Sequence, residues 1–185
     1  MTDYKATLVK WMALFQLDEK SRKEILDSLH PEIKKGFDII TKLAIEELEK
    51  QTDNKEFFKK AAETIETLLA FSVFSGYMLY LIENHIDPVK ENLSQRESTK
   101  SLGTEWMMHY EVDQGNKLLS SIDPIISQML QMGTGGWMNQ LFLQFPECMD
   151  YTYKTVTNVE KFINWSTHQG YLFGILEQQL NSSPK

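Results

Sequence analysis

The sequence feature that most constrains the fold is an uncharged stretch near the middle of the chain. Residues 68–82 read LLAFSVFSGYMLYLI and contain no Asp, Glu, Lys, Arg or His. They continue an amphipathic segment that begins near Glu56, and the combined pattern predicts a central helix over residues 54–86. A helix that is apolar on every side is a buried one, so we expect the other helices to pack around it.

The same stretch raises the question of a membrane span. A spanning helix needs about 20 apolar residues, whereas this run between Glu66 and Glu83 reaches only about 15. The N-terminus mixes acidic and basic residues and lacks the long apolar core of a signal peptide. The single Cys excludes an internal disulfide and is typical of a reducing compartment. We therefore expect a soluble, cytoplasmic protein with no membrane span.

Length and composition indicate one globular domain built of long helices. The 185 residues suit a single domain over residues 1–185. The 42% of hydrophobic and 24% of charged residues are close to the average for globular proteins. Only nine Gly and five Pro are present, which leaves few positions for turns. The formal net charge of −7 argues against nucleic-acid binding, because such proteins usually carry a basic surface.

Helix signals recur along the whole chain and strand signals do not. Asp53 and the Asp-Pro pairs at 87–88 and 123–124 have the residue types of helix N-caps. Period-two alternation and Asn-Gly or Asp-Gly hairpin turns are missing. The fold class is therefore predicted to be all-α, a single helical bundle of roughly six to eight helices. Helices are predicted at 4–15, after Asp18, from Pro31, at 54–86, 105–122, 125–132 and 137–145, and from Pro146 to Leu180.

Two segments lack a regular helical pattern. Residues 89–104 are the most polar part of the chain, and we expect a short frayed helix and a mobile loop there. Gly133-Thr134-Gly135-Gly136 is predicted to end the helix before it. No strand signal precedes these glycines and no Lys-Ser or Lys-Thr follows them, so a tight turn is favoured over a phosphate site.

Residue types that carry chemistry are sparse and poorly grouped. Glu105 and His109 share one helix face, but a carboxylate-bridged metal site needs a second such pair, and no second Glu-x-x-His is present. Cys148 follows Pro146 in the predicted first turn of the last helix, where a thiol gains reactivity. Glu147 opposes that effect and no neighbouring His can act as a base, so a buried, inert thiol is favoured. No catalytic residue, metal ligand or cofactor is therefore assigned.

Small residues one turn apart occur on two of the predicted helices. Ser72 and Gly76 lie on the central helix, and Gly170 and Gly174 lie on the last helix. Small side chains at this spacing let two helix backbones approach closely. We expect the two helices to cross at these residues. The alternative for Gly170 is a kink that divides the last helix.

Charge is distributed unevenly between the two halves of the chain. Residues 101–185 hold four of the 19 Lys and Arg and eight of the 26 Asp and Glu, but six of the nine Met and three of the four Trp. The cores of protein interfaces are likewise poor in charge and rich in Met and aromatic residues. The pattern fits an interface or a ligand pocket as well as it fits a plain core.

Three classes of function remain, in order of preference. The first is a non-catalytic interaction or regulatory protein that binds a protein partner or itself through the charge-poor C-terminal half. The second is a helical sensor or carrier that binds an apolar small molecule in the bundle core, since ligand pockets are mostly apolar. The third, well behind, is an enzyme assembled from distant residues such as Glu105, His109 and Cys148. The residues expected to line an interface or pocket are Phe71, Phe74, Tyr77, Met78, Trp106, Met107, Trp137 and Trp165.

Overall fold

The computed structural model describes residues 3–91, 93–95, 102–110, 120–150 and 153–182. Within these ranges the chain forms seven α-helices and two short 3-10 helices, and no β-strand. This confirms the predicted all-α class. The elements are α1 (Tyr4–Leu14), α2 (Glu19–Ser28), α3 (Pro31–Gln51), α4 (Lys55–Glu83), η1 (Leu93–Gln95), α5 (Leu102–Tyr110), α7 (Pro124–Gln144), η3 (Pro146–Asp150) and α8 (Tyr153–Ser182).

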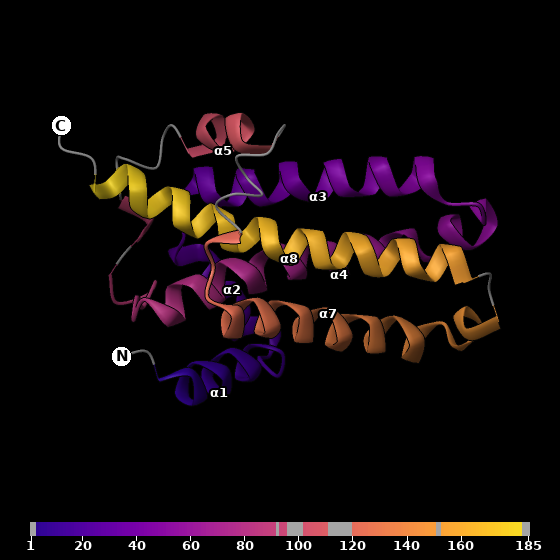
Figure 1. Cartoon of the computed structure of the whole chain (residues 1–185), viewed down its shortest axis with the longest axis horizontal. Coiled ribbons are helices and arrows are strands. Elements are labelled where there is room, and N and C mark those ends of the chain that lie inside the picture. The colour runs from indigo at the N-terminus through magenta and orange to yellow at the C-terminus, as the bar shows by residue number, and fades with distance from the viewer. Residues whose placement is uncertain (1–2, 92, 96–101, 111–119, 151–152, 183–185) are drawn as a thin grey trace.

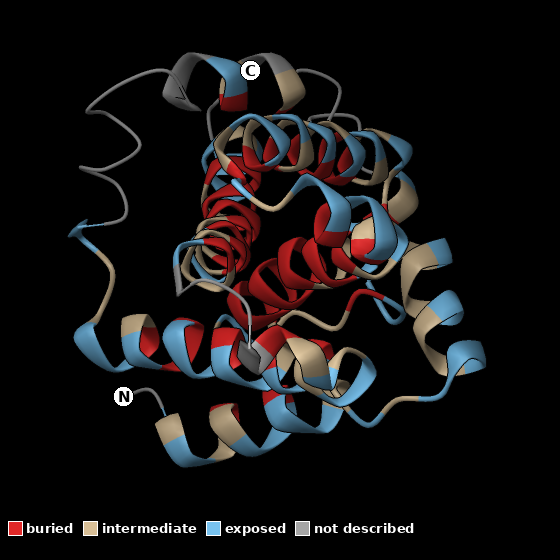
Figure 2. Ribbon diagram, turned by 90° about the vertical axis from the view of Figure 1, so that its right-hand side faces the viewer, coloured by how far each residue is buried: buried red, intermediate tan, exposed pale blue. Residues whose placement is uncertain are grey.

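The central helix is α4, and its main partner is α8. Helices α3 and α7 pack against this pair, and α1 packs against α4 (Figure 1). Every residue from Ser72 to Leu81 is buried, as expected for a helix with no charge on any side. An end-on view shows the buried residues gathered on the inner sides of the helices (Figure 2). The structure therefore confirms a bundle built around the uncharged stretch.

Helix α4 is also long and apolar enough to cross a membrane, judged by length and composition alone. An 18-residue window within it has a mean hydropathy of 1.6, and 72% of that window is buried inside the bundle. The core helix of a soluble protein passes the same test. The absence of a membrane span stays a prediction.

Most helix starts follow the capping signals in the sequence. The Asp18 carboxylate accepts the Ser21 N–H at 2.7 Å, and the Asp123 carboxylate accepts the Ile125 N–H at 2.8 Å. The predicted cap at Asp53 is wrong. Asn54 caps α4 by accepting the Phe57 N–H at 2.9 Å, while the Asp53 carboxylate accepts a hydrogen bond from the Thr155 hydroxyl. Asp53 and Asn54 are both suitable N-cap residues in the sequence. In the structure Asp53 is engaged with Thr155, and Asn54 is the cap.

The polar segment at 89–104 begins with a cap that starts no α-helix. Asp87 accepts the Val89 and Lys90 N–H groups at 3.1 and 3.2 Å, but the chain then forms a turn and the short helix η1. Residues 96–101 lie outside the described part, and α5 begins at Leu102. The helix predicted at 105–122 therefore starts earlier than expected. It is described only to Tyr110, because residues 111–119 also lie outside the described part.

The glycine-rich segment does not end a helix, which corrects the prediction. Helix α7 runs unbroken through Gly133-Thr134-Gly135-Gly136. A Cβ on Gly133 would lie 2.7 Å from Cη2 of Trp11, so glycine is the residue that lets this indole pack against α7. Each glycine costs a helix about 1 kcal/mol. Burial of Trp11, which is 0% exposed, offsets that cost.

The last helix begins later than predicted. Pro146 opens the separate 3-10 helix η3, and α8 starts at Tyr153. Cys148 therefore lies in η3, not in the first turn of the last helix. The expectation of a helix dipole acting on this thiol is wrong for that reason. Helix α8 is continuous through Gly170, so the alternative of a break there is excluded.

The contact between α4 and α8 is made by the two backbones. A Cβ on Gly76 would lie 1.9 Å from the Thr167 carbonyl oxygen, and a Cβ on Gly170 would lie 1.9 Å from the Val73 carbonyl oxygen. A Cβ on Gly174 would overlap the ring of Tyr80. Ser72, one turn before Gly76, is buried and donates its hydroxyl to the Leu68 carbonyl at 2.6 Å. No side chain separates the two helices at Gly76 and Gly170, so glycine is required on both of them.

Candidate binding site between α1, α4 and α7

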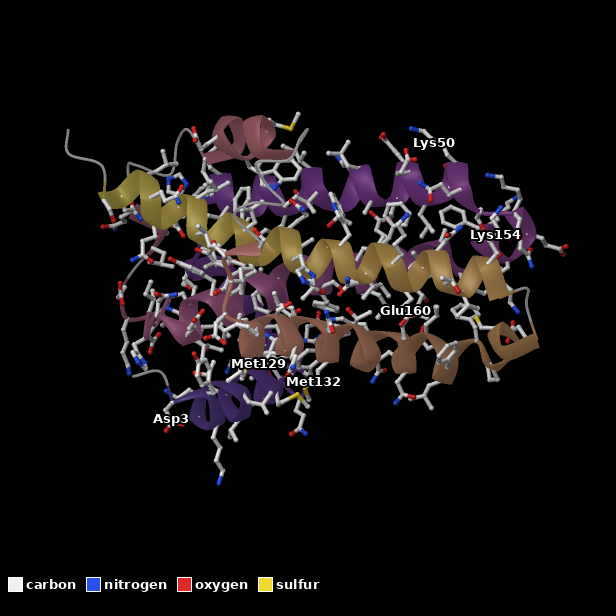
Figure 3. All side chains as sticks on the ribbon, in the orientation of Figure 1. Asp3, Lys50, Met129, Met132, Lys154 and Glu160 are labelled. Carbon is white, nitrogen blue, oxygen red and sulfur yellow. The ribbon has the colours of Figure 1, made fainter. Side chains whose placement is uncertain are left out.

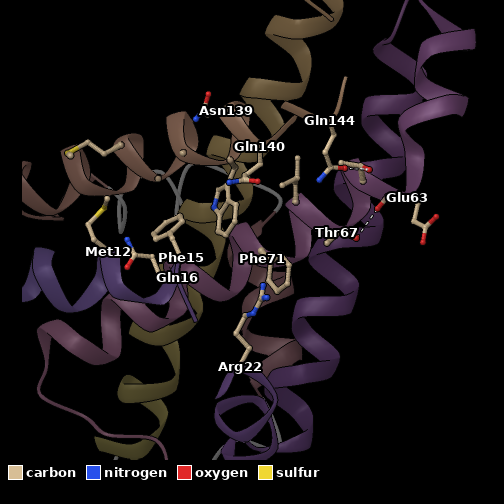
Figure 4. A pocket seen from close by; sticks show the side chains of 16 residues that line it. Met12, Phe15, Gln16, Arg22, Glu63, Thr67, Phe71, Asn139, Gln140 and Gln144 are labelled. Carbon is tan, nitrogen blue, oxygen red and sulfur yellow. Dashed lines mark hydrogen bonds between the residues drawn. The ribbon is translucent and has the colours of Figure 1, made fainter. Parts of the chain in front are cut away.

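A pocket of about 780 Å³ opens between the end of α1, the first residues of α2, the middle of α4 and the outer part of α7 (Figure 4). Small-molecule sites commonly measure about 300–1,000 Å³. The lining residues are Met12, Phe15, Gln16, Arg22, Glu63, Thr64, Thr67, Leu68, Phe71, Met132, Gly133, Gly136, Trp137, Asn139, Gln140 and Gln144.

Three aromatic rings from three separate segments form the apolar wall of the pocket. The centroids of Phe15 and Trp137 lie 4.6 Å apart, and those of Phe71 and Trp137 lie 5.8 Å apart with the rings 15° from parallel. All three side chains are only partly buried, so each keeps a part of its surface open. The Trp137 indole nitrogen is buried and has no hydrogen-bond partner among the described residues.

The position of this wall is fixed by Trp11. Its indole nitrogen donates to the Ser75 carbonyl of α4 at 2.8 Å, and its ring meets Phe15 edge-on at 5.2 Å. Gly133 leaves room for Trp11, and Gly136 lies against the ring of Phe15. Glycines that looked like a helix end in the sequence thus make space for aromatic side chains.

Arg22 is the one cationic residue among those that line the pocket. Its guanidinium carbon lies 4.7 Å from the centroid of Phe71, a cation–π contact, as Figure 4 shows. Its guanidinium makes no ion pair or hydrogen bond with any residue in the described part of the chain, although its charge interacts with the nearby Asp18 carboxylate. The nearby carboxylate of Asp18 caps α2, and that hydrogen bond lowers the pKa of Asp18 below its usual value. A guanidinium that lies over an aromatic ring can still donate hydrogen bonds through its N–H groups.

The rest of the rim is polar and almost free of charge. Four amide side chains come from Gln16, Asn139, Gln140 and Gln144, and two hydroxyls come from Thr64 and Thr67. Thr64 donates to the side-chain oxygen of Gln144 at 3.0 Å. Glu63 is the one acidic lining residue, and it is exposed.

Only two of the eight residues predicted to line an interface or pocket meet in this site. They are Phe71 and Trp137. Phe74, Tyr77 and Met78 belong to the closed core. The remaining three predicted residues are on α5 and α8 and are described next.

Trp106, Met107 and Trp165 are placed apart from the pocket. Trp106 is buried and donates its indole N–H to the side-chain oxygen of Gln169 at 3.0 Å. Met107 is 45% exposed on α5. Trp165 is partly buried and packs against two groups of buried apolar residues, one that includes Leu172 and one that includes Ile163. Sequence reasoning also missed Phe15 and Arg22. No local pattern links Arg22 to Phe71, about 50 positions away, or Phe15 to Trp137, about 120 positions away.

A cluster of tyrosine and glutamate side chains joins α4 to α8 near the C-terminal end of α4. The Tyr77 hydroxyl donates to the buried Glu177 carboxylate at 2.6 Å, and the Tyr171 hydroxyl donates to Glu83. Burial, with Glu83 and Glu177 nearby, raises the pKa of Tyr80 to about 12. Burial and the hydrogen bond to Glu83 raise the pKa of Tyr171 as well. Both phenols therefore stay protonated at neutral pH and act as hydrogen-bond donors rather than bases.

The other residues considered for chemistry do not come together. Cys148 is buried, and burial together with Glu147 raises the pKa of its thiol to about 11, so it is no nucleophile at neutral pH. The side chain of His109 lies outside the described part, so its pairing with Glu105 stays untested. No group of three or more His, Cys, Asp or Glu residues is placed to hold a metal ion in the described ranges.

No family model matches the chain, and comparisons with curated proteins and with solved structures gave no significant match. Fold and site geometry are therefore the basis for any statement on function.

Proposed function

We propose that this is a non-catalytic binding protein that pairs with a second copy of itself through the outer face of α7. The observation that carries the proposal is that α7 has 21 residues and no charged side chain, although much of it is exposed. Helix α3 has the same length and packs on the same central pair. Its exposed positions are Pro31, Lys35, Asp38, Lys42, Glu46, Glu49 and Lys50, and all but the first are charged.

The exposed apolar residues of α7 form one stripe. Ile125, Met132, Gly136 and Leu143 follow each other at spacings of seven, four and seven residues, which keeps them on one side of a helix. Ile125 is 43% exposed, Met132 54% and Leu143 67%. Met132 lies on the side of α7 that faces α1 (Figure 3).

The spacings of seven, four and seven residues are the same in both chain directions, so the stripe can pair with an antiparallel copy of itself. In an antiparallel pair of α7 helices, Ile125 would face the partner's Leu143, and Met132 would face the partner's Gly136. A long Met side chain opposite a glycine fills the space that the glycine leaves. A self-complementary contact of this kind is what a two-fold dimer requires.

Charge favours this face over the others. Two copies with a formal net charge of −7 each repel one another. At the α7 face the two copies can meet without bringing carboxylates together. The face is about 30 Å long at 1.5 Å per residue, so the interface is small, and we expect a dissociation constant of about micromolar order.

The experiment is analytical ultracentrifugation over a concentration series. We expect a monomer–dimer equilibrium for the wild type, and a monomer for Leu143→Glu because it places two carboxylates in the interface. Val89→Glu is the matched control, since Val89 is 46% exposed and lies outside α7. A wild-type monomer at the highest concentration, or a Leu143→Glu dimer as tight as the wild type, would contradict the proposal.

A second candidate function, binding of a small molecule, is supported by the pocket walled by Phe15, Phe71 and Trp137. This pocket lies toward the outside of the bundle, whereas the sequence led us to expect a site in its core. Native mass spectrometry of freshly purified protein tests the candidate. A bound ligand gives an extra mass that disappears under denaturing conditions.

A further inference from the structure

We infer that the pocket between α1, α4 and α7 binds an aromatic carboxylate, a flat apolar ring system that carries one negative charge. This inference rests on the second candidate function and names its ligand class. The ring system would lie against Phe15, Phe71 and Trp137, and the carboxylate would bind the guanidinium of Arg22.

The wall suits a flat ring better than an aliphatic chain. Aromatic rings prefer offset-stacked or edge-to-face contacts with centroids about 4.5–7 Å apart. Phe15, Phe71 and Trp137 already contact one another at 4.6 and 5.8 Å, and each is only partly buried. A flat ligand can extend this cluster without moving it.

Arg22 supplies the charge that selects a carboxylate. A guanidinium forms two parallel hydrogen bonds with a carboxylate through its N–H edge, and such pairs are stronger than neutral hydrogen bonds. The contact with Phe71 at 4.7 Å holds the guanidinium at the aromatic wall of the pocket. The guanidinium of Arg22 donates to no acceptor in the described part of the chain, so an incoming anion displaces none. The Asp18 carboxylate, which interacts with it electrostatically, is held by the Ser21 N–H as the cap of α2.

The remaining lining residues limit the ligand to a single negative charge. Arg22 is the one cation of the lining, Glu63 stands at the rim, and the whole protein is acidic. A polyanion such as a nucleoside triphosphate would meet repulsion that one guanidinium does not offset. The amide groups of Gln16, Asn139 and Gln140 can hydrogen-bond to neutral substituents on the ring.

The test compares 2-naphthoate with 2-naphthamide by isothermal titration calorimetry at pH 7. The two probes share the ring system and differ in charge. We expect 2-naphthoate to bind about tenfold or more tightly than 2-naphthamide to the wild type, and Arg22→Gln to remove that preference. Lys23→Gln is the matched control, because Lys23 is the next residue, is exposed and pairs with Asp27. It should keep the preference.

Each other outcome overturns a defined part of the inference. Equal binding of the two probes, or a preference that survives in Arg22→Gln, shows that the pocket does not select a carboxylate. Absence of binding by both probes overturns the ligand class, whereas the second candidate function fails only if native mass spectrometry also shows no bound ligand. At protein concentrations where the wild type is monomeric, Leu143→Glu should bind 2-naphthoate like the wild type, because Leu143 does not line the pocket, and this separates ligand binding from self-association.

Discussion

The two sides of α4 are packed in opposite ways. Toward α8, the backbones touch at Gly76 and Gly170, where there is no room for a Cβ atom. Toward α1 and α7, the rings of Phe71 and Trp137 meet over part of their surface and leave a pocket of about 780 Å³. Glycines are needed on both sides. Gly76 and Gly170 let the backbones of α4 and α8 approach, and Gly133 makes room for Trp11. The first contact holds the bundle together, and the second leaves surface for binding.

The largest effect should come from a methyl group at the backbone contact. In Gly76→Ala the new Cβ would lie 1.9 Å from the Thr167 carbonyl oxygen, and relief requires the helices to separate. We expect the free energy of unfolding in urea to fall by about 4 kcal/mol or more. Gly135→Ala is the control, since nothing lies within 4 Å of its Cβ, and it should gain up to about 1 kcal/mol. Similar stabilities for the two variants would disprove the backbone contact.

Next in size is the loss of one buried hydrogen bond on the same side. Tyr77→Phe removes the donor that meets the Glu177 carboxylate at 2.6 Å. We expect a loss of about 1–3 kcal/mol in urea unfolding, the usual cost of an unsatisfied buried group. Glu177→Leu in addition should recover part of that loss in a double-mutant cycle. An additive pair of changes would show that the two groups do not interact.

A ring on the pocket side should matter less for stability. Phe71→Ala removes the contacts with Trp137 and Arg22, but the side chain is only partly buried. We expect a loss of about 1 kcal/mol in urea unfolding and a changed tryptophan emission spectrum. A loss as large as that of Gly76→Ala would mean that the pocket wall is part of the closed core.

The last prediction needs no mutation and concerns Cys148. The rate at which its thiol is alkylated reports how well the side chain is buried. Its pKa is raised to about 11 because burial and Glu147 disfavour the thiolate. A raised pKa keeps the proton on, so alkylation of the native protein by iodoacetamide should be very slow at pH 8 and accelerate toward pH 11. The unfolded chain in urea should react at the rate of a free cysteine. Rapid labelling of the native protein at pH 8 would contradict this burial.

Local patterns predicted the parts of the fold that local physics controls. The uncharged stretch identified α4, and Asp18 and Asp123 marked helix starts because capping is a contact within one turn. The prediction that Gly133 ends a helix was wrong. The cost of a glycine to the helix can be read locally, whereas the burial of Trp11 that offsets it depends on a distant part of the chain. The prediction that Pro146 opens the last helix was wrong as well, because a proline suits the first turn of a 3-10 helix and of an α-helix equally.

The candidate site was less predictable than the fold for the same reason. Phe71 and Trp137 could be named as aromatic residues in uncharged surroundings, but Arg22 lies in the most charged half of the chain. Its role depends on the ring that it stacks on, and that ring is supplied by another helix. A site assembled from three elements is fixed by how they pack, which no single spacing encodes.

Met132 and Gly136 belong both to the pocket lining and to the stripe on α7. Occupation of the pocket and pairing of two chains would then be thermodynamically linked, and such linkage acts equally in both directions. If each pocket binds its ligand about tenfold more tightly in the pair, filling both pockets tightens pairing about a hundredfold. Because a two-fold pair carries two such pockets beside one interface, ligand titrations at concentrations where chains associate should deviate from a single-site curve.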